Sequence, residues 1–307
     1  MEPLRAHDPE SVGRYRLRGR LGAGGMGQVY LGESGEGALV AVKVVHPGLA
    51  HDDRFRDRFR REVEVSSQVT GPWVAAVVDA DLDAEHPWLA TQYVAGPTLL
   101  RAVSESGPLV PERVRALGHG LALALGAIHG RGLVHRDLKP SNVLLDGDRP
   151  RLIDFGISRA IGGTRMTSTG MVIGTPAFMS PEQISEAEVG SASDVFSLGS
   201  VLYFAATGHG PFGEATPVVL LLRISRDEPA LDAVPEALRQ PIEACLAKNP
   251  DDRPTAAALA TLLGSVTSDE AVSAPVTATT PTAGSDATTV LALPVHPEHW
   301  APASGRT

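Results

Sequence analysis

The residues best suited to chemistry in this sequence lie between positions 135 and 156. They form two short runs, His135-Arg136-Asp137-Leu138-Lys139-Pro140-Ser141-Asn142 and Asp154-Phe155-Gly156. Asn142 and Asp154 offer hard oxygen ligands that suit magnesium, and Asp137 offers a carboxylate that could orient or deprotonate a hydroxyl. Lys139 adds a positive charge, which helps to neutralise a transferring phosphoryl group. Together the two runs predict a phosphoryl-transfer site.

The rarity of lysine points to the same site. The chain has three lysines, at positions 43, 139 and 248, against 24 arginines, and its two asparagines are at 142 and 249. Lysine is a compact charge that can sit between phosphates without a planar partner, whereas a guanidinium favours planar, bidentate contacts. Lys43, Lys139 and Asn142 are therefore expected to belong to the site.

A short hairpin should bring the two runs together. The apolar residues 143–145 and 151–153 flank Asp146-Gly147-Asp148, which is typical of a tight turn between two strands. Such a hairpin would put Asn142 beside Asp154. A shared metal ion requires this proximity.

Two helices are expected in this half of the chain. Apolar residues between 114 and 128 recur every three or four positions, which predicts an amphipathic helix that leads the chain to His135. Residues 194–204 are apolar on nearly every side and predict a buried helix. Asp194 at its start would accept backbone N–H groups, either from its own helix or from a loop above it.

A glycine loop lies near the N-terminus. Residues 15–18 and 29–31 predict two strands around Gly22-Ala23-Gly24-Gly25-Met26-Gly27. The same glycine spacing occurs in dinucleotide-binding folds, where it opens a helix, but here Gly27 leads into a β-branched and aromatic strand. A glycine hairpin can offer backbone N–H groups to phosphates. On its own, the loop leaves both interpretations open.

Lys43 lies at the centre of a predicted strand over residues 39–45. Apolar residues on both sides favour a buried, paired ammonium over a surface lysine on an edge strand. Its partner should be a carboxylate on the following helix, where Phe55, Phe59 and Val63 form an apolar stripe. Glu62 is the better candidate and Glu64 the alternative.

The order of these patterns predicts an α+β domain with flanking segments. Residues 1–14 are polar and should form a flexible lead-in, whereas residues 15–95 are rich in strands. After the break at Gly96-Pro97 the pattern becomes helical, over residues 96–264, and residues 265–307 have the composition of a disordered Ala/Thr/Pro/Ser-rich tail. Further strands are expected at 73–78 and 88–94, and further helices at 235–246 and from Thr255 to near 264.

Bulk properties exclude several classes of protein. A net charge of -9 argues against nucleic-acid binding, because phosphate backbones attract basic surfaces. Cys245 is the single cysteine, so no intrachain disulfide is possible and a reducing compartment fits. No apolar run is long enough to span a bilayer, and the sequence predicts a cytoplasmic protein with no membrane span in this segment.

In order and spacing, these residues resemble a known family, the protein kinases. The matching elements are the glycine loop, Val40-Ala41-Val42-Lys43, Glu62, His135-Arg136-Asp137 with Asn142, Asp154-Phe155-Gly156 and Ser180-Pro181-Glu182. The resemblance is closest to the bacterial Hanks-type (eukaryotic-like) serine/threonine kinases and covers about residues 15–263. It implies a two-lobed fold, with a small β-rich N-lobe containing one main helix and a larger α-helical C-lobe. It also implies ATP-dependent phosphorylation of Ser/Thr hydroxyls of proteins, including the chain's own activation loop, and a role in signalling.

The resemblance assigns a role to each site residue. Lys43, held by Glu62, would bind the α- and β-phosphates, Asp137 would orient the substrate hydroxyl with Lys139 beside it, and Asn142 and Asp154 would hold Mg²⁺, or Mn²⁺ in its place. The remaining ATP contacts would come from Leu21, Gly22, Ala23, Gly24, Gly25, Met26, Gly27, Gln28, Val29, Ala41, Thr91, Gln92, Tyr93, Val94 and Leu144.

Other residues would shape the C-lobe and its regulation. Thr175 would belong to the platform for the protein substrate, and Glu182 would pair with Arg253. Arg136, just before Asp137, suggests regulation by phosphorylation of the activation loop, for which Thr167 and Thr169 are the candidate sites.

Two residues depart from the family pattern. Ser180 replaces the commoner alanine, and Ser66, one turn past Glu62, is smaller and more polar than the usual apolar residue. The helix that carries Glu62 would then be held less firmly. Activation could depend on a partner, including a homodimer for trans-autophosphorylation.

Two other functions share the same kind of fold. A pseudokinase scaffold would lack part of the chemistry, but nothing is missing from this sequence. A small-molecule phosphotransferase would not need the long hydroxyl-rich segment that ends in Ser180-Pro181-Glu182, because such a segment builds a platform for a peptide. Both alternatives are therefore less favoured than a protein kinase.

Overall fold

The computed structural model describes residues 1–24, 26–154, 176–185 and 187–264. Several residues singled out by the sequence lie outside these ranges, as does the predicted tail 265–307: Gly25, Phe155, Gly156, Thr167, Thr169 and Thr175. Within the described ranges, no helix combines the length and the hydropathy of a membrane span.

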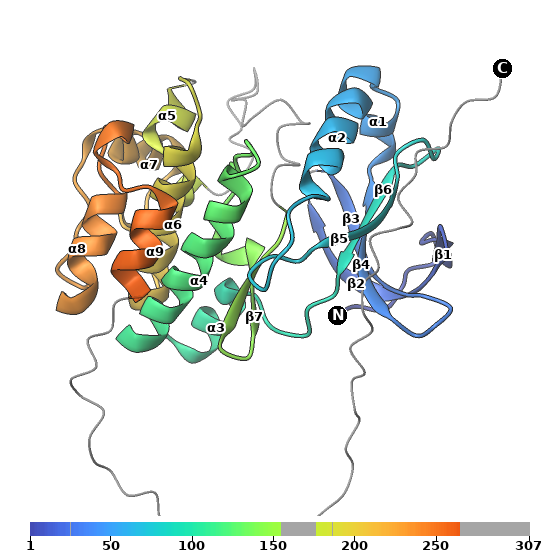
Figure 1. The fold of residues 1–307 in the computed structure, drawn as a ribbon, viewed down its shortest axis with the longest axis horizontal. Coiled ribbons are helices and arrows are strands. Elements are labelled where there is room, and N and C mark those ends of the chain that lie inside the picture. Colours follow the sequence, from blue (N-terminus) through green and yellow to red (C-terminus); the bar gives the residue numbers. More distant parts are fainter. Residues whose placement is uncertain (25, 155–175, 186, 265–307) are drawn as a thin grey trace, which may run out of the picture. The chain divides into compact units, whose positions relative to one another are not determined.

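The N-lobe is built on one antiparallel sheet with the strand order β1-β2-β3-β4-β6-β5 (Figure 1). Its strands are β1 (Ser11–Val12), β2 (Tyr15–Gly24), β3 (Gly27–Glu33), β4 (Leu39–Val45), β5 (Val77–Asp81) and β6 (Trp88–Gln92). Along β2, buried Tyr15 and Leu17 alternate with exposed Arg16 and Arg18. This alternation is typical of a sheet with one face packed and one face in solvent.

Helix α2 (Asp53–Ser66) follows the short helix α1 (Pro47–Ala50) and packs on the sheet. Asp52 caps its N-terminus, because its carboxylate accepts hydrogen bonds from the N–H groups of Arg54 and Phe55. Its apolar stripe forms a core with residues of the sheet: Phe55, Phe59, Val63, Met26, Val45 and Leu89. Burial of this stripe also buries Glu62, whose residue exposure is 9%.

The first residues of the chain differ from the flexible lead-in that their composition predicted. The backbones of Glu2 and Arg20 exchange two hydrogen bonds, of 2.9 and 2.8 Å. The side chain of Asp8 is 3% exposed and accepts hydrogen bonds from the Arg20 guanidinium and, at 2.9 Å, from the Tyr30 hydroxyl. The Arg20 guanidinium holds the pKa of Asp8 well below its usual range. One buried carboxylate thus fastens a polar segment to β2 and β3.

The expected strand over residues 73–78 is also placed differently. Only its last residues enter β5, whereas residues 73–75 pair with β8 (Arg149–Leu152) of the C-lobe. Leu152 N donates to Trp73 O at 2.8 Å, and Ala75 N donates to Leu152 O at 3.0 Å. The competing C-lobe strand explains the difference, because a sequence pattern predicts an extended segment but not its partner.

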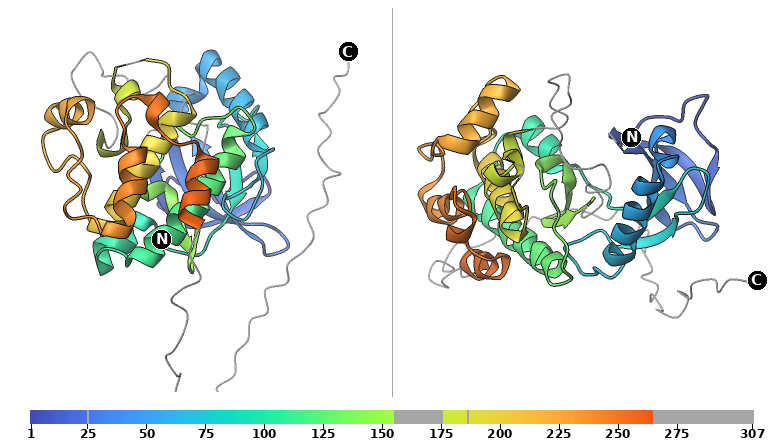
Figure 2. Two further views of the ribbon diagram at one scale, coloured as in Figure 1. Left: turned by 60° about the vertical axis from the view of Figure 1, so that its left-hand side comes forward. Right: turned by 90° about the horizontal axis from the view of Figure 1, so that it is seen from above.

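The C-lobe contains the predicted hairpin and a group of helices. The hairpin joins β7 (Val143–Asp146) to β8, and the helices are α3 (Leu99–Ser106), α4 (Pro111–His129), α5 (Pro181–Ile184), α6 (Ser191–Thr207), α7 (Pro217–Arg226), α8 (Glu236–Cys245) and α9 (Ala256–Gly264). In both views of Figure 2, the yellow-to-red helices α6, α8 and α9 lie close to the green α4. Burial in this core raises the pKa of the Cys245 thiol to about 12, so this cysteine stays protonated at neutral pH.

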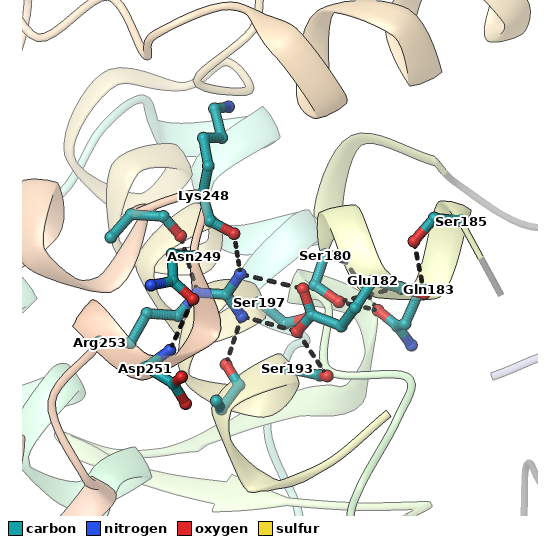
Figure 3. A network of polar contacts seen from close by, with 12 residues as sticks. Ser180, Glu182, Gln183, Ser185, Ser193, Ser197, Lys248, Asn249, Asp251 and Arg253 are labelled. Atoms are coloured by element: carbon teal, nitrogen blue, oxygen red, sulfur yellow. Dashed lines mark hydrogen bonds and ion pairs between the residues drawn. The ribbon is translucent and has the colours of Figure 1, made fainter. Parts of the chain in front are cut away.

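A buried ion pair joins α5 to the turn before α9 (Figure 3). Arg253 donates to both oxygens of Glu182, at 2.6 and 2.9 Å, and its other N–H groups bind the carbonyl oxygens of Ala192, Ala247 and Lys248. Burial alone would raise the pKa of Glu182, but hydrogen bonds from Arg253 and Ser193 outweigh it and lower the pKa. The ionised carboxylate therefore stabilises the fold at neutral pH, and this stabilisation is lost as the pH falls through the lowered pKa.

Replacing Glu182 with glutamine should destabilise the protein by about 3–5 kcal/mol, because it leaves the buried Arg253 charge without its counterion. Urea unfolding at neutral pH measures the loss, and the difference from the parent should shrink as the pH is lowered. The matched control is Glu236→Gln, which removes an exposed partner of Arg239 and should change the free energy of unfolding by about 0.5 kcal/mol or less. Equal stability of Glu182→Gln and the parent would contradict the prediction.

Candidate active site

The loop that carries Asp137 is held by the buried carboxylate of Asp194, at the start of α6. Asp194 accepts hydrogen bonds of 2.8 Å from the backbone N–H groups of His135 and Arg136, and Nε2 of His129 lies 2.7 Å from it. Of the two sources of N–H groups expected from the sequence, the loop above the helix is the one observed. Arg136 has a φ of 67°, which is costly for a residue with a Cβ. The contacts of Asp194 hold the loop in this conformation.

His135 connects this loop to the chain just before Asp154. Its Nδ1 accepts a hydrogen bond from Asp137 N at 3.3 Å, and its Nε2 lies 3.2 Å from Ile153 O. Nε2 must therefore carry the proton, and the ring is neutral. Burial lowers the pKa of His135 despite the nearby carboxylates, which agrees with a neutral ring.

Three of the predicted residues form one hydrogen-bonded group. Lys139 Nζ donates to both carboxylate oxygens of Asp137, at 3.0 and 2.7 Å. Asn142 Nδ2 donates to Asp137 O at 2.8 Å and to Asp137 Oδ2 at 3.2 Å. The Asp137 side chain is still 44% exposed, so its carboxylate remains accessible to a hydroxyl.

The hairpin β7–β8 links this group to Asp154. Val143 pairs with Leu152, and Ile153 N donates to Asn142 O at 3.0 Å, so Asp154 follows directly after a residue bonded to Asn142. Asp154 also contacts the N-lobe, because its Oδ2 lies 3.1 Å from Lys43 Nζ of β4. The structure thus brings together Lys43, Asp154 and the group around Asp137.

Glu62 is buried on α2, as are Phe55, Phe59 and Val63. Lys43 forms an ion pair with Asp154, and its pairing with Glu62 stays a prediction. Glu64, the alternative, is exposed. Ser66, one turn after Glu62, is 1% exposed.

One face of the sheet gathers several of the residues expected to contact ATP. Ala41 and Lys43 alternate with the buried valines of β4 and so share a face. Val29 of β3 pairs with Lys43, and Thr91 of β6 pairs with Ala41. Cross-strand partners lie on the same face of a sheet. All four residues therefore line the face on which Lys43 meets Asp154.

Gln92, at the end of β6, with Tyr93 and Val94 connects this sheet to the C-lobe, and these three residues are here called the hinge. The chain then packs tightly on β7, since a Cβ at Gly96 would lie 1.9 Å from Leu145 O. Thr98 also forms a backbone bridge to Leu144. Leu144 therefore lies beside the segment that leaves the hinge.

The glycine loop is a β hairpin, as the strand that follows it predicted. Gly22 pairs with Val29, and Gly24 pairs with Gly27. A Cβ at Gly22 or Gly24 would meet no atom within 4 Å, whereas a Cβ at Gly27 would lie 1.8 Å from Val44 O. Gly27 is thus required by packing, and the loop at Gly22 and Gly24 is open on the side where a ligand could approach.

The flanking positions of the loop have mixed environments. Leu21, Gln28 and Val29 are half-buried, Ala23 is exposed, and Gln28 Nε2 donates to Gly22 O. Met26 was expected among the ATP contacts, but its side chain is buried with Phe55 and Val45 in the core under α2. Any contribution of Met26 to a ligand would come from its backbone.

The donor set fits a divalent cation shared with a ligand. The amide N–H₂ group of Asn142 is used by Asp137, so the amide oxygen is the atom that could bind a cation beside the Asp154 carboxylate. No group of three or more His, Cys, Asp or Glu suited to a metal occurs in the described part of the chain. An ion here would complete its shell with water and phosphate oxygens, as Mg²⁺ commonly does.

Comparisons with known proteins agree with this geometry. Residues 15–262 match the protein kinase domain family. The serine/threonine-protein kinase AfsK of Streptomyces coelicolor is 52% identical over 260 residues, which are 84% of this chain and 32% of that protein. The chain therefore spans about a third of the length of this relative.

Solved structures agree as well. The PknI kinase domain of Mycobacterium tuberculosis has a TM-score of 0.64 at 28% identity, covering 83% of this chain and 96% of that domain. Rad53 (residues 1–466) in complex with AMP-PNP has a TM-score of 0.69 at 26% identity, covering 80% of this chain and 64% of that one. The chain therefore belongs to the protein kinase family, which uses ATP and a divalent metal ion, and it is a serine/threonine protein kinase of the bacterial, Hanks type.

Proposed function

We propose that the chain transfers the γ-phosphoryl group of Mg-ATP to Ser/Thr hydroxyls of proteins, including its own activation loop, and so acts in signalling. The observation that carries the proposal is the contact between Lys43 of the N-lobe and Asp154 of the C-lobe, 3.1 Å apart. Asp154 is tied in turn to the group of Asp137, Lys139 and Asn142. A cation, a nucleophile-orienting carboxylate and metal ligands then lie in one region, as phosphoryl transfer requires.

Asp137 would act on the substrate hydroxyl. Its exposed carboxylate would accept the hydroxyl proton as the new O–P bond forms and the bond between the γ-phosphorus and the ADP oxygen breaks. Lys139, within 3.0 Å of both oxygens of Asp137, would hold the carboxylate in position and neutralise the developing charge on the phosphoryl group. Asn142 would fix the rotamer of Asp137 through its amide N–H₂ group.

The nucleotide would lie against the face of Val29, Ala41 and Lys43. Lys43 would contact the α- and β-phosphates and exchange part of its contact with Asp154 for a pairing with Glu62. Asn142 and Asp154 would hold Mg²⁺, or Mn²⁺, which when bound neutralises phosphate charge. The likeness to Rad53, which was solved with AMP-PNP, supports an ATP-type ligand.

Proteins are the proposed substrates, with Thr175 as part of the platform that receives them. The net charge of -9 supports the proposal that nucleic acid is not a partner. A homodimer for trans-autophosphorylation is also part of the proposal. Its motive is Ser66, which is smaller and more polar than the apolar residue usual one turn past Glu62, so that activation could depend on a second copy.

Replacing Asp137 with asparagine should lower the rate of phosphorylation of a generic protein substrate by about 10²–10⁴-fold, the usual effect of losing a general base. The affinity for nucleotide should stay near that of the parent, since Asp137 is not among the residues proposed to hold it. Radiolabelled ATP with protein and small-molecule acceptors measures the rate. Asp148→Asn, an exposed carboxylate on the hairpin, is the control, and full activity of Asp137→Asn would refute the mechanism.

Replacing Asp194 with asparagine should reduce kcat more than the affinity for ATP. An amide has one acceptor oxygen, so one of the two loop N–H groups at His135 and Arg136 loses its partner, and Asp137 becomes less well positioned. Steady-state kinetics with varied ATP separates the two quantities. Circular dichroism controls for folding, and an unchanged kcat in a folded variant would contradict the role of Asp194.

Incubation of the purified chain with ATP should add phosphate at Thr167 or Thr169. A phosphate brings about two negative charges, which Arg136 could bind. Peptide mass mapping locates the phosphate, and Thr167→Ala with Thr169→Ala should lower the rate after incubation. Unmodified peptides together with full activity would remove this part of the proposal.

A further inference from the structure

Arg151 of β8 is a cationic side chain with no role in the chemistry described above. It lies three residues before Asp154, and its side chain is 15% exposed. Long charged side chains are rarely buried to this extent unless they have partners. The partners of Arg151 are informative, because they lie in different parts of the chain.

The guanidinium reaches from the C-lobe to two segments of the N-lobe. Nη1 donates to Pro72 O at 2.6 Å, in the connection between α2 and β5, and Nη2 donates to Gln92 Oε1 at 3.2 Å, at the end of β6. Nε lies 3.9 Å from Asp146 Oδ2 of the same hairpin. One side chain therefore links the connection after α2, the hinge and the hairpin.

Both ends of this link border the proposed nucleotide site. Gln92 is the first hinge residue, and its N–H group donates to Ala76 O at 2.9 Å, so its backbone is fixed to the same connection. On the hairpin, Arg151 is the direct register partner of Leu144, which was expected to contact ATP. Two contacts therefore connect the hinge segment to the hairpin: the backbone at Gly96 and Pro97 packs on β7, and the side chain of Arg151 binds Gln92.

A simple surface ion pair would not explain these contacts. Exposed pairs join two charges in solvent and contribute little, whereas both acceptors of Arg151 within 3.2 Å are neutral oxygens of the N-lobe. A planar guanidinium can reach two acceptors at once, and an ammonium cannot do so with the same geometry. The arrangement favours a positioning role.

We propose that Arg151 is a positioning residue for the nucleotide. It holds the hinge at a fixed separation from the hairpin that carries Leu144 and leads to Asp154, and so sets the width of the site that receives the adenine ring. The inference rests on the proposed function, because it concerns the affinity of the same site for ATP.

The test is the affinity for ADP and ATP, measured by calorimetry for the parent, Arg151→Gln and Arg151→Lys, beside kcat and both KM values. Arg151→Gln should raise the Kd for nucleotide and the KM for ATP about five- to tenfold, as expected for the loss of charged hydrogen bonds. kcat and the KM for the protein substrate should stay within about twofold, since Asp137 and its partners are untouched. Arg151→Lys should fall between the two, because lysine keeps the charge but not the fork.

Two further variants make the test specific. Arg149→Gln removes a charge from the same strand and side, where Arg149 is exposed, and should leave the Kd unchanged. In a double-mutant cycle, Arg151→Gln on a Gln92→Ala background should have a smaller effect on the Kd than on the parent, because the two side chains share a contact.

The outcomes distinguish a failure of the proposed function from a failure of the role of Arg151. No nucleotide binding by the parent would refute the proposed function. A parent that binds, with Arg151→Gln of equal affinity or with changes only in melting temperature, would overturn the role of Arg151. Should Arg151→Gln fail to fold, parent-like affinity in both Arg151→Lys and Gln92→Ala would overturn it equally.

Discussion

The carboxylate of Asp194 is the contact on which the active site depends. It lies on a buried helix and accepts two backbone N–H groups from a loop whose conformation would otherwise be unfavourable at Arg136. The loop then presents Asp137, while His135 reaches Ile153 with a neutral ring. The buried carboxylate of Asp194 therefore fixes the loop that carries Asp137.

The β7–β8 hairpin connects this loop to the N-lobe. On one side it bonds Asn142 to Ile153, and on the other it adds residues 73–75 of the N-lobe to β8. Asp154 follows directly and meets Lys43. Strand pairing therefore fixes the backbone on both sides of the hairpin, and the side chains of Asp154 and Lys43 complete the contact between the lobes.

Much of this site could be predicted from the sequence. The hairpin and the helix before His135 follow from local periodicity and turn chemistry, which are properties of neighbouring residues. For Asp194 the sequence predicted an acceptor of N–H groups but left open whether its own helix or a loop supplies them. The links of Arg151 to Pro72 and Gln92, and of Asp8 to Arg20, could not be predicted, because they join residues far apart in the chain that show no periodic pattern. The exchange of partners at residues 73–75 was missed for the same reason. His129 gave only a weak signal, its position in the last turn of a predicted helix.

The fastening of the N-terminal segment has a consequence for solubility. A sheet edge with free N–H and C=O groups is a template for pairing with another chain. Here the outer edge of β2 is occupied by β1 and by Glu2, and the buried carboxylate of Asp8 keeps this cover in place. The first dozen residues thus act as a guard against intermolecular strand addition next to the glycine loop.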